Sequence, residues 1–302
     1  IMNNIIVNNV AATAGAGIYL NNALRVNILH NTIANNDSTG TSAASFTPGN
    51  LLISNPQPAG VVSTPHSQNL VDISGQTFTD PVLRDNIIHG NRSFYWDATL
   101  NGGLGGLAPN PDMPLWDVAV MGFPFPVSLS PAYCVLSTLS DASGGDYDDG
   151  TNVAADPGFV APYYNDLAAA AVLDEGGNFI TVRFIPIGKN GDYHITCGSV
   201  AINMGDMSIT TMPALNLDYD GEIRPGGMFV DAGADELRPS CSADFDVDGD
   251  VDTQDLMIFV QNWMTVCQYY EYSPCDLNRD GIVNLRDYQL FSQQFGSTNC
   301  CP

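Results

Sequence analysis

Two runs of oxygen-bearing side chains near the end of the chain repeat each other at an offset of 32 residues. Each run has Asp or Asn at loop positions 1, 3, 5, 9 and 12, and glycine at position 6, where a chain turns sharply around a cation. Calcium takes about six to eight oxygen ligands in such a wrap, and position 7 contributes a backbone carbonyl. We predict two bound calcium ions with these ligands: Asp244, Asp246, Asp248, Asp250 (carbonyl), Asp252 and Asp255, then Asp276, Asn278, Asp280, Ile282 (carbonyl), Asn284 and Asp287.

One amphipathic helix is expected directly after each loop, with its apolar stripe facing the module's core. No helix is indicated before either loop, and position 12 is Asp where EF-hands carry Glu. The sequence therefore predicts two loop-then-helix units, and the stripe residues are Leu256, Phe259, Val260 and Trp263 in the first helix, and Tyr288, Phe291 and Phe295 in the second.

Residues 241–302, which contain both units, resemble a type I dockerin. The resemblance implies that calcium is required for folding and that the helix surfaces dock onto a cohesin-like protein. Loop positions 10 and 11, which contribute to partner choice in that family, are Thr253-Gln254 in one half and Leu285-Arg286 in the other. The two halves present different faces, which favours an unusual partner over a dual binding mode.

The N-terminal half repeats the pattern Asn-x-aliphatic-x-x-Asn. Each copy carries a short β-rich run and no helix-length amphipathic stretch, so we expect coils of about 20 to 30 residues made of several short strands. Stacked coils would bury their aliphatic side chains and align the corner asparagines as hydrogen-bonded ladders. A turn-rich β-sandwich is the alternative. The copies span residues 4–9, 31–36, 50–55 and 86–91.

The stretch GIYLNNALRVNILHNTIANN at 17–36 resembles right-handed parallel β-helix repeat proteins of the secreted bacterial type. The predicted fold is mainly β: a parallel β-helix followed by a small α-helical calcium module. Because the repeat spacing is irregular, segments 37–49 and 56–82 are expected to protrude as loops from coil corners.

Three later segments resemble the closing region common in secreted bacterial β-helix proteins, where it would cover the last coil. They are 154–160, 191–206 and 217–236. The expected domains are 1–124, parallel coils with inserted loops; 125–240, terminal coils and capping segment; and 241–302, the dockerin-like module.

The charge balance restricts the partners. The 302 residues include 33 Asp and Glu against 9 Lys and Arg, a formal charge of −24. Such acidity argues against nucleic acid, and no apolar run approaches the roughly 18 residues of a membrane span. Ile1 begins in mid-pattern, so we expect a product of a longer precursor.

Seven cysteines, five of them in the last 62 residues, favour an oxidising compartment and secretion. A pseudo-twofold module brings its two ends together, so Cys241 is expected to pair with Cys300 or Cys301. Cys267 and Cys275 are the next expected pair, and an odd number leaves one thiol over.

No residue is assigned a catalytic role. Polysaccharide-cleaving chemistry needs an arginine near calcium or two opposed carboxylates, and nothing in the sequence connects the available candidates. The histidines are isolated, and exposed aromatics offer at most sugar stacking. The candidates considered are Arg25, Arg84, Arg92, Asp146, Asp148 and Asp149; His30, His66, His89 and His194; and Tyr19, Tyr95, Trp96 and Trp116.

We expect a secreted, extracellular or cell-surface structural, adhesion or assembly protein that is not catalytic. Its expected partners are a cohesin-like protein or neighbouring copies of itself joined head to tail as a filament, and an extracellular polysaccharide. The alternative is a fragment of a carbohydrate-active enzyme, a polysaccharide lyase or glycoside hydrolase, attached to a scaffold through its dockerin.

Overall fold

The computed structural model describes residues 1–140, 144–167, 180–181, 191–209, 215–267 and 273–301. Short strands dominate it and most of them pair in parallel, so the expected mainly β class is confirmed. No helix in these ranges is long and apolar enough to cross a membrane.

Four sheets share the first half of the chain, and the chain visits them in turn. The first turn places one strand in each sheet: β1 (Ile5–Val7), β2 (Val10–Ala11), β3 (Ile18–Leu20) and β4 (Asn27–Leu29). The next turns add β5 (Thr32–Ala34), β6 (Asp37–Ser38), β7 (Val61–Ser63) and β8 (Val82–Arg84), then β9 (Ile87–His89), β10 (Arg92–Asp97), β12 (Val118–Val120) and β13 (Pro131–Ala132), and finally β14 (Val135–Leu136) and β15 (Val153–Ala154).

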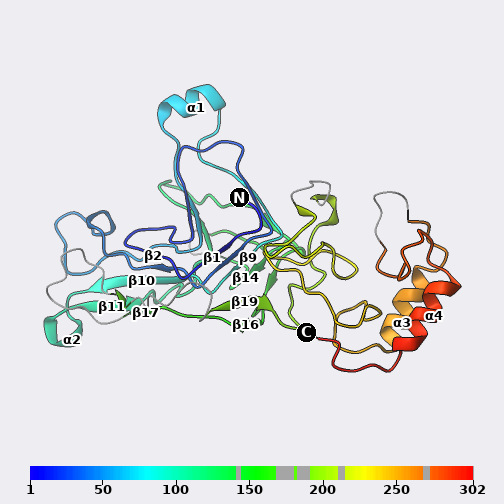
Figure 1. The fold of residues 1–302 in the computed structure, drawn as a ribbon. Helices are drawn as coiled ribbons and strands as arrows, with labels where there is room; N and C mark the ends of the chain where they lie inside the picture. The colour runs from blue at the N-terminus through cyan, green and yellow to red at the C-terminus, as the bar shows by residue number, and fades with distance from the viewer. Residues whose placement is uncertain (141–143, 168–179, 182–190, 210–214, 268–272, 302) are drawn as a thin grey trace.

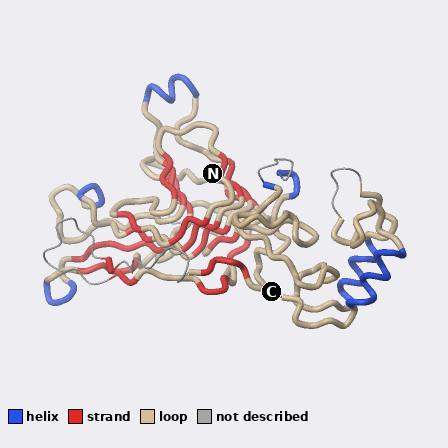
Figure 2. Tube along the Cα trace, in the orientation of Figure 1, coloured by secondary structure: helices blue, strands red, loops and turns tan. Residues whose placement is uncertain are grey.

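The register keeps the same side chain at the same corner of each turn. Ile6 pairs with Ile33, and Ile33 pairs with Ile88, within the sheet order β1-β5-β9-β14-β15. Ile33 and Ile88 are fully buried, and Figures 1 and 2 show these strands side by side at the centre of the molecule. The stacked parallel turns are compatible with a β-helix-like fold.

Two ladders of asparagine amides run across the turns, as the repeat predicts. In one ladder, the backbone N–H and the side-chain Nδ2 of Asn9 donate to Oδ1 of Asn36, at 3.0 and 2.9 Å. The backbone N–H and Nδ2 of Asn36 donate in turn to Oδ1 of Asn91. Asn91 ends this ladder on the Asp117 carboxylate, 2.9 Å away. The other ladder joins Asn4, Asn31 and Asn86.

The repeat at 50–55 is not a further turn. These residues lie in a protruding loop, where the Leu52 side chain is 62% exposed. The asparagine motif places polar side chains at a corner but does not determine which strands pair. For this reason the motif wrongly predicted a turn at 50–55.

Segments 37–49 and 56–82 are only partly loops, which corrects the prediction. They contain β6 and β7, and β7 is fully buried between β3 and β12. A strand of three residues is enough to continue a turn of the stack. Such a short strand is hard to recognise in the sequence when its flanks are rich in Ser and Thr. The protruding parts carry η1 (Ala43–Ser45) and α1 (Gln68–Ser74).

Further elements extend from the stack. They are the hairpin partner β11 (Gly106–Pro109) with α2 (Leu100–Gly103), and the later pieces β16 (Phe159–Ala161), β17 (Asp166–Leu167), β18 (Ile180–Thr181), β19 (Asp192–Ile195) and η2 (Met207–Ile209).

The closing segment, which we define as residues 215–239, lies along the flank of the turns. Gly233 N–H donates to the Asp85 carbonyl and Ala234 N–H to the Thr32 hydroxyl, both in the second turn, and the Leu217 carbonyl accepts from Asn3 of the first turn. Arg224 is buried there and donates to Glu236 at 2.8 Å, and to the carbonyls of Gly233 and Ala234. The segment expected to cap the last turn therefore covers several turns from the side.

The tail module, residues 241–267 and 273–301, contains α3 (Thr253–Gln261) and α4 (Leu285–Gln294), which lie apart from the strands in Figure 1. Its core is formed by Phe245, Phe259 and Phe291, whose rings stack with centroids 5.5 to 6.4 Å apart. The two sequence-related halves therefore share one small core.

Two disulfides hold the tail module. Cys241–Cys300 closes it on itself, which confirms the expected clasp. Cys197–Cys301, which the sequence did not indicate, ties its end to the body.

The predicted Cys267–Cys275 pair is wrong, and three cysteines rather than one lie outside disulfides. Cys275 stands where the repeat places Ala243, and both are fully buried in the module core, which leaves Cys275 a packing role.

Candidate metal centres

The first loop gathers three carboxylates at the start of α3. Oxygen atoms of Asp244, Asp246 and Asp255 lie within 4.8 Å of one another, and a second trio shares Asp255 with Asp250 and Asp252. Backbone hydrogen bonds fix the arrangement, since Asp255 accepts from Phe245 N at 2.6 Å and from Asp252 N at 2.8 Å. Loop position 12 thus closes the loop and caps the helix at once.

The second loop repeats this geometry at α4. Oxygens of Asp276, Asp280 and Asp287 lie within 4.8 Å of one another. Asp287 accepts from Asn278 N at 3.0 Å and from Asn284 N at 2.9 Å, as Asp255 does in the first loop. The duplication seen in the sequence is therefore a duplication of local structure.

The donor set fits a hard cation. Every oxygen in the three trios comes from a carboxylate. Calcium prefers such oxygen ligands, whereas softer metals prefer thiolate or imidazole. In the first loop one oxygen each of Asp246 and Asp250 is buried without a hydrogen-bond partner. Burial, followed by the carboxylate of Asp255, raises the pKa of Asp244 to about 6 and of Asp246 to about 7. A bound cation would relieve both the crowding and the missing partners.

The remaining predicted ligands divide by role. Asp248 is exposed and accepts the backbone N–H of Asp250 rather than joining a trio. Asp252 and Asn284 cap their helices, accepting from Gln254 N and Arg286 N. The Asp250 carboxylate itself faces the first loop's trio, where the sequence had assigned only its carbonyl.

Each loop pairs with the segment that follows the other loop's helix. Val251 exchanges backbone hydrogen bonds with Gly296 and Ser297, and Val283 pairs in the same way with Met264 and Thr265. The two loop-helix units are interlocked, so a change in one loop reaches the end of the opposite helix.

Loop position 4 differs sharply between the halves. In the first loop it is Val247, which is 2% exposed and packs with Ala232 and Leu237 in the body. In the second loop it is Arg279, which is exposed. Both have a left-handed backbone, with φ of 61° and 58°. The first loop is therefore docked on the body and the second is not.

Three exposed aromatic side chains lie against the phenylalanine core, one on α4 and one just after each helix. Trp263 and Tyr288 both contact the ring of buried Phe259, with centroids 5.7 and 5.9 Å away, and Phe295 contacts Phe291 at 5.8 Å. We name Trp263, Tyr288 and Phe295 the aromatic row; they are 43%, 41% and 48% exposed.

The apolar stripe predicted to face the core is buried only in part. Val260 is 61% exposed and the aromatic row is also exposed, because the module core is narrower than the stripe.

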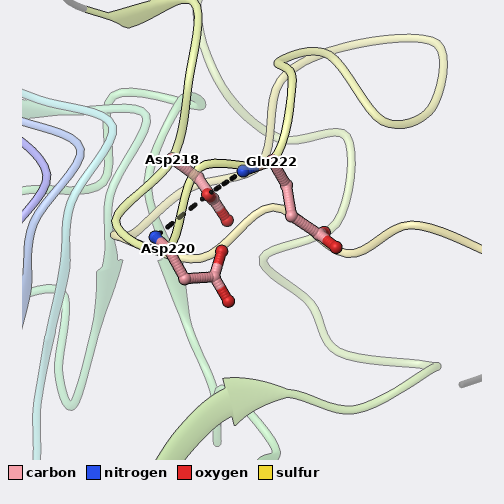
Figure 3. Close-up of side chains that lie close together, drawn as sticks. All are labelled: Asp218, Asp220 and Glu222. Atoms are coloured by element: carbon pink, nitrogen blue, oxygen red, sulfur yellow. Dashed lines mark hydrogen bonds between the residues drawn. The ribbon is translucent and has the colours of Figure 1, made fainter.

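A third acidic cluster, which the sequence reading treated as structural, joins Asp218, Asp220 and Glu222 (Figure 3). Oδ1 of Asp218 already accepts the backbone N–H groups of Asp220, Gly221 and Glu222 at 2.7 to 3.2 Å, and Oδ2 accepts Glu236 N. These hydrogen bonds form a backbone turn, and the turn is sufficient to bring the three carboxylates together. The Asp-x-Asp-Gly-Glu spacing is the signal that could have drawn attention to it.

The catalytic candidates are not assembled. Arg84 is paired with Asp206, and Arg92 with Asp37 at 2.6 Å. Asp149 accepts from Thr151 within its own turn. The remaining candidates are similarly scattered: His30 and His66 are buried, His194 pairs with Asp192 and Asp220, and the exposed Tyr19 stands on β3.

Comparisons of this chain with protein-family models, with curated proteins and with solved structures find no match.

Proposed function

We propose that this protein is a secreted structural or adhesion component in which a non-catalytic parallel β-helix carries a calcium-dependent, dockerin-like connector. The observation that carries the proposal is the convergence of three carboxylates in each of two duplicated loops, each at the start of a helix. Calcium at both sites would neutralise these loops and fix the two helices relative to each other.

The aromatic row is the proposed contact surface of the connector. Exposed aromatic side chains are enriched among the residues that contribute most of the binding energy of protein interfaces. The exposed Thr253-Gln254 and Leu285-Arg286 pairs differ between the halves, so the surface is asymmetric. Its proposed partner is a cohesin-like protein or a neighbouring copy of this chain.

The two disulfides support the extracellular part of the proposal, because they are consistent with an oxidising compartment.

The test uses the whole chain and a double variant, Trp263→Ala with Tyr288→Ala. Binding to a panel of cohesin domains is followed by calorimetry, and self-association by light scattering, both with calcium and with chelator. We expect calcium-dependent binding or association that the double variant weakens at least about tenfold. The matched control is Tyr19→Ala, an aromatic side chain of similar exposure (48%) on a sheet.

Calcium binding is measured separately in the same preparations. If the loops bind calcium yet neither cohesin domains nor further copies bind, the connector role is refuted. If the loops bind no calcium at millimolar concentration, the whole proposal fails.

A further inference from the structure

Two adjoining cavities lie between the closing segment and the tail module. They have volumes of about 170 and 280 Å³ and share three lining residues, Arg238, Asp276 and Arg279. Since a water molecule occupies roughly 30 Å³, each cavity has room for a small organic molecule.

The two arginines on these cavities differ from most other arginines of the chain. The chain has 33 carboxylate side chains for nine cationic ones, and four other arginines are paired with Asp or Glu. Among the described residues, neither Arg238 nor Arg279 makes a side-chain hydrogen bond or ion pair. Arg238 interacts electrostatically with Glu222, but among the described residues the N–H donors of both guanidinium groups are unused.

The two arginines reach the cavities from different segments, the closing segment and the second loop. Arg238 ends the closing segment and its stem runs beside Gly226, where an added Cβ would lie 3.2 Å from Arg238 Cγ and 2.6 Å from the Leu237 carbonyl oxygen. Arg279 comes from position 4 of the second loop. The first loop is docked through Val247, which is buried in the body core and holds the two segments together.

Calcium changes the charge around these arginines. Asp276 lines both cavities and Asp244 lines the first, and these are position 1 of the two loops. With cations bound in the loops, the carboxylate charge is offset and the guanidinium groups dominate the local field. This step rests on the proposed calcium binding.

We propose that the junction binds a small organic carboxylate, held between the guanidinium groups of Arg238 and Arg279, in the calcium-loaded protein. A guanidinium offers parallel N–H donors that match the two oxygens of a carboxylate. Pro239, Pro274 and Leu277 supply apolar wall for the carbon skeleton. The carboxylate belongs to a free organic acid or to a uronic acid sugar.

The experiment titrates galacturonate, succinate and neutral galactose into the whole protein by calorimetry in excess calcium. We expect binding of at least one acid and none of galactose. Arg238→Gln and Arg279→Gln should each weaken that binding about tenfold or more, because each removes charge-assisted hydrogen bonds. Arg25→Gln is the matched control, since Arg25 is exposed and lines neither cavity.

Comparing the two acids distinguishes the two possible sources of the carboxylate. Tighter binding of galacturonate identifies a uronic acid unit, and tighter binding of succinate identifies a free acid. Binding of galactose as strong as that of galacturonate, unchanged binding in both Gln variants, or no binding of either acid overturns the inference. Calcium titration of the same samples shows whether such a failure belongs to the junction or to the loops.

Discussion

The body and the tail module both bury carboxylates, but they neutralise them differently. In the body, Arg92 pairs with the buried Asp37, and the buried Arg224 pairs with Glu236. Within residues 241–267 and 273–301, the one ion pair joins Arg286, 77% exposed, to Asp280 at 3.4 Å. The buried Asp255 accepts only backbone N–H groups.

This difference indicates how each region offsets the free-energy cost of burying its carboxylates. A buried carboxylate is costly unless a cation or hydrogen-bond donors lie beside it. The body supplies an arginine to Asp37 and to Glu236, and hydrogen-bond donors of Asn91 and Ser137 to the buried Asp117. In the described part of the tail module the trios have only the exposed Arg286, which contacts Asp280 of the second trio, so under the proposed function a cation from solution would offset most of their charge. The body should therefore fold regardless of metal, and the tail should depend on it.

Calcium removal is expected to have the largest effect and to separate the two regions. At a calcium concentration 100 times the dissociation constant, each site adds about 2.7 kcal/mol to the folded tail module, and chelator removes it. Hydrogen exchange should then rise across α3 and α4 and stay unchanged across β5 and β9. Equal protection of α3 and α4 with and without chelator would contradict the comparison.

Single-loop variants sharpen this test. Asp255→Asn and Asp287→Asn should each lower calcium stoichiometry by one ion, and exposed Asp112→Asn should not. Since the loops are interlocked, either variant should also increase exchange at the end of the opposite helix.

Replacing the buried arginine of the body is expected to have the next largest effect on the unfolding free energy. Arg224→Met leaves Glu236 buried without its partner, which should cost about 3–5 kcal/mol of unfolding free energy. The matched tail variant, Arg286→Met, removes an exposed cation and should cost less than about 1 kcal/mol. Denaturant unfolding in calcium measures both. Similar costs for the two variants would show that the body does not depend on its buried pair.

The parts that sequence reasoning found are local. A calcium loop places all its ligands within twelve consecutive residues, so their spacing alone indicated both acidic loops. The asparagine corners were also visible, because Asn31–Asn36 and Asn86–Asn91 keep the same five-residue step. Local spacing fixes which side chains share a corner or an ion.

The parts that it missed are contacts between distant segments. Cys197 and Cys301 are 104 residues apart, and no pattern around either cysteine indicates the other. The docking of Val247 on the body is equally invisible, since position 4 of a calcium loop carries no ligand. The Asn50–Asn55 copy misled for the converse reason: it has the motif, but its residues form only isolated antiparallel bridges instead of joining the parallel turns.

That misleading copy provides a third, smaller test within the body. Asn36 is fully buried and its side chain hydrogen-bonds to Asn9, Asn91 and Ile6, so Asn36→Ala should cost about 1–3 kcal/mol. Asn50 is exposed, and Asn50→Ala should change the unfolding free energy by less than about 0.5 kcal/mol. Thermal unfolding of the calcium-loaded protein compares them. Equal, small changes would mean that the ladder does not stabilise the stack.

The smallest expected effect concerns a surface cation of the body. Burial alone would lower the pKa of His194, but hydrogen bonds from its ring to Asp192 and Asp220 raise it to about 9. A histidine whose folded pKa exceeds its unfolded value of about 6.5 stabilises the fold below pH 6.5, and this contribution is lost as the pH rises through 9. His194 is 44% exposed, so solvent screening keeps the contribution below about 1 kcal/mol. His194→Gln should therefore lower stability most at pH 6 and barely at pH 10, and 1 M salt should shrink the difference at pH 6. A difference that is independent of pH would show that these body carboxylates do not rely on a protein cation.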